Sequence, residues 1–132
     1  MDSADTSSQI LTIECGTVYF RDDQVICVDL KEDYTIEIKD LEQIVSSIQK
    51  LAIGNKYPVV TVGGKYTSFS YEVLREAADP KHHINTSALA FVIKSPHQRL
   101  LANFFVKVIT PPIPTKYFEK LEEAVEWLKE QK

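Results

Sequence analysis

Apolar residues form short strand-like runs in some segments of the chain and recur at helical spacing in others. Together these patterns predict a defined series of strands and helices. Residues 10–14, 17–21 and 24–30 are short runs rich in β-branched side chains. Gly16 separates the first run from the second, and the two aspartates at 22–23 form a turn between the second run and the third. Such runs predict strands, and we expect the third to fold back on the second as a hairpin.

A helical spacing follows this hairpin. Asp40 is the predicted N-cap, with Gln43 three residues further on, which is the spacing of a capping box. Gly54 and Asn55 are expected to end the helix. Its apolar residues fall on one face. They are Leu41, Ile44, Val45, Ile48, Leu51 and Ala52.

Strands and helices then alternate three times. Strands are predicted at 57–62, 88–93 and 115–118. Helices are predicted at 71–78 and after the 115–118 strand. Another is predicted to begin after Ser95, which caps it, with Pro96 in the first turn and Gln98 completing a capping box. We expect the third helix to bury Leu100, Leu101, Phe104, Phe105 and Val108, and the last helix to bury Leu121, Ala124, Val125 and Leu128.

This order predicts an α/β fold with about four helices. Strands that alternate with helices form a mostly parallel sheet, to which the N-terminal hairpin adds antiparallel pairing. The strand at 57–62 is almost continuously apolar, as expected of a strand buried on both faces. A chain of 132 residues corresponds to one domain, which we place at 9–132. Residues 1–8 are polar and predict a disordered tail.

Composition and charge narrow the classes of function. The net charge is −4 and no cluster of basic residues offsets it, which argues against a nucleic-acid partner. No apolar run has the length of a membrane span, and the N-terminus lacks the pattern of a signal peptide, so a cytoplasmic location is expected. Cys15 and Cys27 lie in strand-like runs and are interpreted as free, buried thiols.

The C-terminal half carries a resemblance to a known family. The run ANFFVKVITPPIPTKYF, followed by EEAVEWL, resembles small stand-alone bacterial proteins of the STAS type, whose fold is that of SpoIIAA. PVVTVGG is similar to the STAS strand that leads to the regulatory loop. The resemblance covers about residues 10–130. In antagonist STAS proteins a serine that begins the second helix is phosphorylated, and Ser70 occupies that place. Phe69 and Thr61 stand where that family usually has acidic residues.

The loop after the 57–62 strand is the strongest candidate for a partner-binding or regulatory site. Its candidate residues are Gly63, Gly64, Thr67, Ser68 and Ser70. A phosphate cradle is a weak interpretation, because neither a P-loop nor a GxGxxG pattern is present. Ser70 is predicted to cap the second helix, and a phosphate there would sit at the positive helix end. Capping alone and capping with modification both remain open.

No other residues form a recognisable catalytic, cofactor or metal site. His97 is interpreted as an exposed histidine, and His82 and His83 lie in a predicted loop without a third ligand. We therefore expect a regulatory protein–protein interaction domain that is not an enzyme and has no cofactor. Whether it also forms a homodimer is left open. The alternative is a small module that binds an apolar ligand or lipid, since CRAL-TRIO domains share a related layout.

Overall fold

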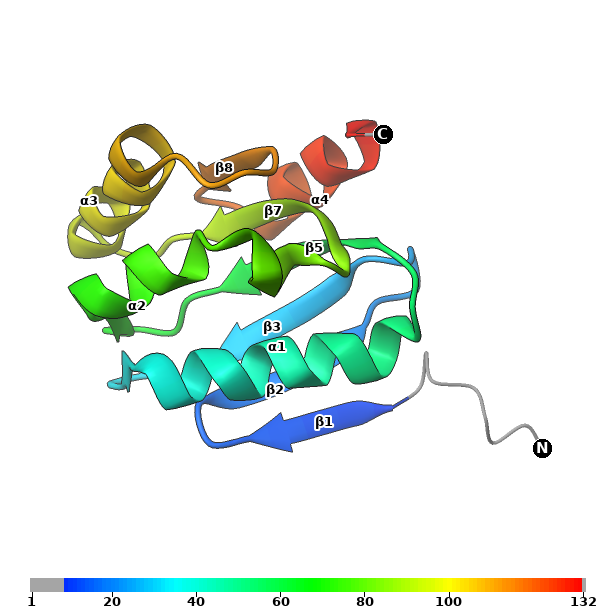
Figure 1. Cartoon of the computed structure of the whole chain (residues 1–132). Helices are drawn as coiled ribbons and strands as arrows, with labels where there is room; N and C mark the ends of the chain where they lie inside the picture. Colours follow the sequence, from blue (N-terminus) through cyan, green and yellow to red (C-terminus); the bar gives the residue numbers. More distant parts are fainter. Residues whose placement is uncertain (1–8, 132) are drawn as a thin grey trace.

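A computed structural model describes residues 9–131, so the predicted tail at 1–8 lies outside the described part. Its centre is a six-stranded sheet in the order β1-β2-β3-β5-β7-β8 (Figure 1). The strands are β1 (Ile10–Ile13), β2 (Gly16–Phe20), β3 (Ile26–Leu30), β5 (Tyr57–Val62), β7 (Thr86–Val92) and β8 (Thr115–Phe118). The first three pair antiparallel and the last four pair parallel, which confirms the predicted α/β sheet.

Helices cover both faces of this sheet. α1 (Ile38–Ala52), α2 (Tyr71–Ala77) and α3 (Pro96–Phe104) lie on one face, and α4 (Leu121–Glu130) lies on the other (Figure 1). Shorter elements are β4 (Thr35–Ile36) and β6 (Ser68–Phe69), which pair parallel, a 3₁₀ helix η2 (Pro80–His83) and a π-helical turn η3 (Phe105–Ile109). The loop predicted around His82 and His83 is thus one turn of 3₁₀ helix.

The central strands are apolar on both faces because each face has its own core. In β5, Val59 packs with the residues under α1, α2 and α3, and the next residue, Val60, packs under α4. Val60 pairs with Ala90 of β7, and Ala124 of α4 is fully buried against this region. The small alanine side chains let α4 lie close to the sheet.

The first helix begins earlier than predicted. Its N-cap is Glu37, and Asp40 is the third helical residue, so the prediction of Asp40 as the cap was wrong. Asp40 still takes part in a capping box, since its carboxylate accepts from the Glu37 amide at 2.9 Å. It is fully buried and also accepts from the Tyr34 hydroxyl at 2.8 Å. At the other end Ile53 caps the helix in a left-handed conformation, just before Gly54.

The predicted burial of apolar residues on α1 and α3 is confirmed only in part. Ile48 and Phe105 are buried, whereas Ile44 and Leu101 are half-buried, as are Val45 and Phe104. Leu100 and Val108 are exposed at 67% and 65%, so assigning them to the core was wrong. Polar Gln98 occupies the inner side of the first turn of α3, and the wider π turn after α3 changes the direction of the later side chains.

Candidate functional site

The loop at 63–70 lies at the carboxyl edge of the sheet. β3, β5, β7 and β8 run parallel, so the segments that follow them meet at this edge. The strand order β3-β5-β7-β8 progresses in one direction along the sheet. Ligand crevices in open α/β sheets form where the strand order reverses, and this part of the sheet has no such reversal. Any site at this edge must therefore be formed by the loops that follow the strands.

Close packing explains the two glycines of this loop. A Cβ on Gly63 would stand 2.8 Å from Oε1 of Gln98, and one on Gly64 would stand 2.8 Å from the Leu30 carbonyl oxygen. The two amides also have partners: Gly63 donates to the Val92 carbonyl at 3.0 Å and Gly64 to the Thr67 hydroxyl at 2.8 Å. A phosphate cradle needs free amides, so this geometry does not fit one.

The Thr67 side chain holds the loop in place through two hydrogen bonds. Its side chain is fully buried, and its hydroxyl accepts from the Gly64 amide while donating to the Lys31 carbonyl at 2.5 Å. Between Gly64 and Thr67 the chain turns outward, and Tyr66 is exposed. Gly63, Gly64 and Thr67 therefore position the loop, and their buried atoms are not available to a partner.

Gln98 holds the loop against α3. Ser95 caps α3 as predicted, accepting from the Gln98 amide at 3.1 Å. The Gln98 side chain does not complete a capping box: its Oε1 accepts from the Lys94 amide at 2.7 Å. Its Nε2 donates to the carbonyls of Gly64 at 2.8 Å and Thr67 at 3.0 Å. Sequence analysis missed this role, because the capping-box spacing already accounted for the residue.

Ser68 and His97 lie together, although 29 residues separate them. The Ser68 hydroxyl is 2.9 Å from Nε2 of His97, and His97 is exposed in the first turn of α3. A serine nucleophile also needs a group that orients the histidine through its other nitrogen. Within residues 9–131 no hydrogen bond to Nδ1 of His97 is formed. The sequence contains no signal that links these two residues.

Ser70 caps α2 as predicted. Its hydroxyl accepts from the Val73 amide at 3.1 Å, and its own amide donates to the Ile36 carbonyl at 3.2 Å. Ser70 as a whole is half-buried. Tyr71 follows at 52% exposure, and its ring lies 5.2 Å from that of Phe104. Ser70 thus stands at the border between the loop and the α2–α3 surface.

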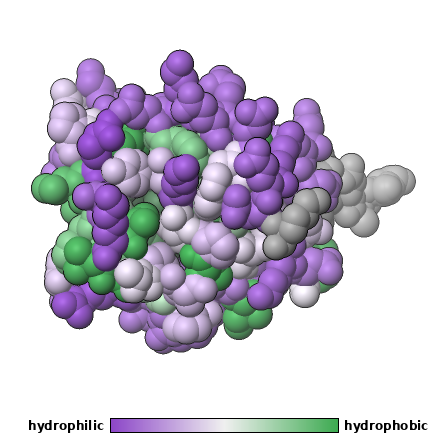
Figure 2. Space-filling model, turned by 90° about the horizontal axis from the view of Figure 1, so that it is seen from above, coloured by the Kyte–Doolittle hydropathy of each residue, from purple (hydrophilic) through white to green (hydrophobic). Residues whose placement is uncertain are grey.

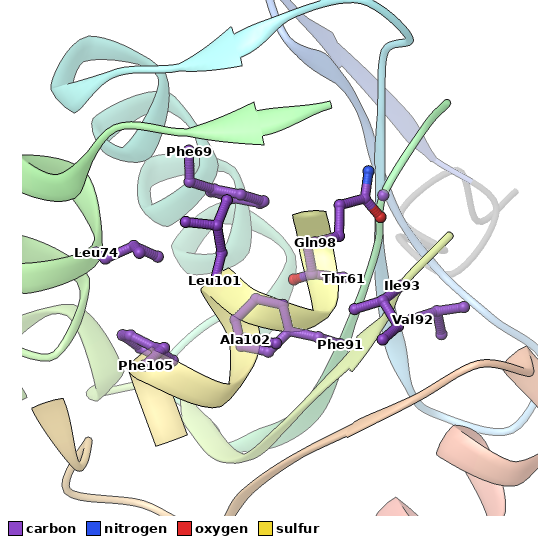
Figure 3. Close-up of a pocket in the computed structure, with 11 residues that line it drawn as sticks. Thr61, Phe69, Leu74, Phe91, Val92, Ile93, Gln98, Leu101, Ala102 and Phe105 are labelled. Carbon is purple, nitrogen blue, oxygen red and sulfur yellow. The ribbon is translucent and has the colours of Figure 1, made fainter. Parts of the chain in front are cut away.

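Two adjoining spaces lie between the helices and the sheet. The larger has a volume of about 80 Å³ and separates α1 and α2 from the sheet. The smaller, of about 20 Å³, lies beside α3, and Phe69, Leu74, Leu101 and Phe105 point toward it (Figure 3). Phe69, Leu74 and Phe105 line both spaces. The linings are almost wholly apolar.

The remaining reactive side chains have structural partners. Cys15 and Cys27 are buried and free, as predicted, and burial raises the pKa of the Cys15 thiol to about 11. His82 binds the Glu76 carboxylate at 2.9 Å, and His83 bonds to the Ala77 carbonyl at 2.6 Å. Across residues 9–131, no three His, Cys, Asp or Glu side chains are grouped to hold a metal ion.

The fold identifies the class of protein. A crystal structure of an uncharacterized DUF3478-family protein with a SpoIIAA-like fold, from Shewanella loihica PV-4, matches with a TM-score of 0.55 at 15% identity over 91% of this chain and 90% of that one. A protein of unknown function from Arthrobacter sp. FB24 matches with a TM-score of 0.31 at 23% identity, over 86% and 98% of the chains. The first of these two matches shows that the chain has the predicted SpoIIAA-like fold.

The family follows from the sequence itself. Residues 18–132 match the model of DUF7793, a domain of unknown function, and the chain belongs to this family. No curated protein matches the sequence. None of the helices among the described residues is long and apolar enough to cross a membrane.

Proposed function

We propose that this domain is a non-enzymatic regulatory module that binds another protein in the bacterial cytoplasm. The contact would be made by a rim surface that consists of Ser68, Ser70, Tyr71, His97 and Leu100. Two contacts join its two segments. One is the Ser68–His97 hydrogen bond, and the other is the tilted contact between the rings of Tyr71 and Phe104, which lies one helical turn after Leu100. The surface is thus continuous across the loop and α3.

The observation that supports this proposal most directly is the exposure of two large side chains, one aromatic and one aliphatic, beside the hydrogen-bonded loop at 63–70. Tyr71 and Leu100 are 52% and 67% exposed. Figure 2 shows exposed apolar groups among hydrophilic ones at the left end of the molecule, the side on which α3 lies in Figure 1. Tyrosine is enriched at protein–protein interfaces and among binding hot spots, and Leu100 adds apolar area beside Tyr71.

The geometry also favours binding over catalysis. The Ser68–His97 pair has no described group that orients the histidine, and both loop glycine amides are already hydrogen-bonded. A fixed charge on Ser70 would change the rim surface without disturbing the fold, since aspartate also caps helices well. Phosphorylation of Ser70 would then regulate binding through charge and desolvation at the contact.

The test has two stages. Partners captured from the native host are first identified by mass spectrometry, and the affinity of the purified partner is then measured for Leu100→Asp and Ser70→Asp. Ile84→Asp is the matched control, because Ile84 is 60% exposed and lies outside the rim surface. We expect both rim variants to melt near the wild-type temperature and to bind at least about tenfold more weakly. Equal affinity for all three variants would refute the rim surface.

A further inference from the structure

The apolar space between α1 and α2 is a second candidate site, separate from the rim surface. Its volume is about 80 Å³, and its walls include Ile44 and Val45 of α1, Val73 and Ala77 of α2, and Leu89 of β7. Protein interiors contain few voids larger than a water molecule, and an empty apolar void of this size lowers stability. A ligand that fills the cavity would offset this loss of stability.

The sequence explains why the helices leave this space. α2 has only seven residues, and two of the three side chains that it presents to the cavity, Val73 and Ala77, are small; the third is Leu74. On α1, Ile44 and Val45 lie in the apolar stripe, yet they are only half-buried. The two helices therefore do not close over the sheet, and their apolar faces meet only in part.

The cavity has a polar end at the turn that follows α2. His82 and His83 of η2 line it there, together with Thr86. The His82 side chain is 12% exposed and is held by Glu76, so it lies near the surface. Burial lowers the pKa of His83, which keeps its imidazole neutral. Its bond to the Ala77 carbonyl then requires the proton on Nε2 and leaves Nδ1 as an acceptor.

The lining also limits the charge and the size of a ligand. No Lys, Arg, Asp or Glu is among the lining residues, and burying an unpaired charge is strongly unfavourable. An engineered dry cavity of about 150 Å³ accommodates benzene. The space here is about half as large, at about 80 Å³, so it can take only a short aliphatic group of about three or four carbons and not a six-membered ring.

We propose that the cavity between α1 and α2 binds a short, uncharged, linear alkyl group of about three or four carbons, with its polar end at the histidines of η2. The alkyl group lies between the Ile44–Val45 side of α1 and the Ala77 side of α2 and packs on Leu89. The adjoining space of about 20 Å³ shares Phe69 with the cavity, so the ring of Phe69 stands between the two spaces. The site does not depend on the rim surface.

The experiment titrates the full chain with 1-butanol and follows methyl signals by NMR, with cyclohexanol as the comparison that is too large for the cavity. Saturable shifts of Val73 and Leu89, together with weaker binding of cyclohexanol, support the proposal. Ala77→Leu fills the cavity and is expected to weaken 1-butanol binding at least tenfold. Ala78→Leu is the matched control: Ala78 is half-buried and adjacent, but it does not line the cavity, so affinity should stay unchanged.

Three results would overturn the proposal: no saturable shift with 1-butanol below the concentration at which it unfolds the protein, equal binding by Ala77→Leu, or tighter binding of cyclohexanol. A wild-type measurement decides the matter if Ala77→Leu does not fold. Xenon, which also enters dry apolar cavities, should give density between α1 and α2 in pressurised crystals. Absence of xenon there overturns the site. Loss of partner binding in the rim variants bears only on the rim surface, so the two proposals can fail separately.

Discussion

Replacing Gln98 tests whether one side chain holds the candidate loop in place. Gln98 is 4% exposed and bonds to three backbone groups, on Gly64, Thr67 and Lys94. Gln98→Met keeps the length of the side chain but removes its amide. The Gly64 carbonyl retains a second donor, the Thr67 amide at 3.2 Å. The Thr67 carbonyl and the Lys94 amide would lose the only partner they have among the described residues.

The expected loss follows from these two groups. A buried polar backbone group without a partner costs about 1–3 kcal/mol. Lys94 lies at the surface, so water can replace part of its bond, whereas the bond to Thr67 is buried. We therefore expect Gln98→Met to lower the free energy of unfolding by about 2–4 kcal/mol. That is a large share of the roughly 5–15 kcal/mol by which domains are stable, but the protein should still fold.

Urea denaturation measures this loss, and hydrogen exchange of the amides at 63–70 reports whether the loop is released. Gln49→Met on the exposed side of α1 is the matched control and should change stability by less than about 0.5 kcal/mol. A loss below about 1 kcal/mol for Gln98→Met, with unchanged exchange, would refute the role of the side chain.

Gln98→Glu adds a pH test of the same contact. Its carboxylate would face the two carbonyl oxygens that now accept from Nε2. That repulsion raises the folded-state pKa above the unfolded value of about 4.3. The destabilisation should therefore be small below about pH 4 and grow as the pH rises. A loss of stability independent of pH would contradict this geometry.

Two further predictions concern the core and the start of α1. Phe105 is 1% exposed and its ring lies 5.6 Å from that of Phe91, so Phe105→Ala should cost about 3–5 kcal/mol in urea denaturation; a shift too small to measure would contradict its burial. The bond to Asp40 raises the pKa of Tyr34 to about 12. Its stabilisation is present below pH 10 and is lost as the pH rises through about 12. In an absorbance titration, Asp40→Asn should return the Tyr34 pKa toward 10.

The sequence was informative wherever structure depends on neighbours in the chain. The strand–helix order follows from apolar spacing, and the Ser70 and Ser95 caps follow from residues three positions apart. The same local rules failed at α3. They placed Leu100 and Val108 in the core, because a regular spacing does not register the buried Gln98 or the π turn.

Tertiary structure decided what the candidate loop does. The glycine pair signals a tight turn in the sequence, but the close approach of Leu30 and Gln98 requires it in the fold. Ser68 meets His97 across 29 residues, a distance that no local pattern encodes. The cavity has the same origin. The spacing of apolar residues predicts that α1 and α2 pack on the sheet, whereas the space left between them depends on side-chain packing across three separate segments.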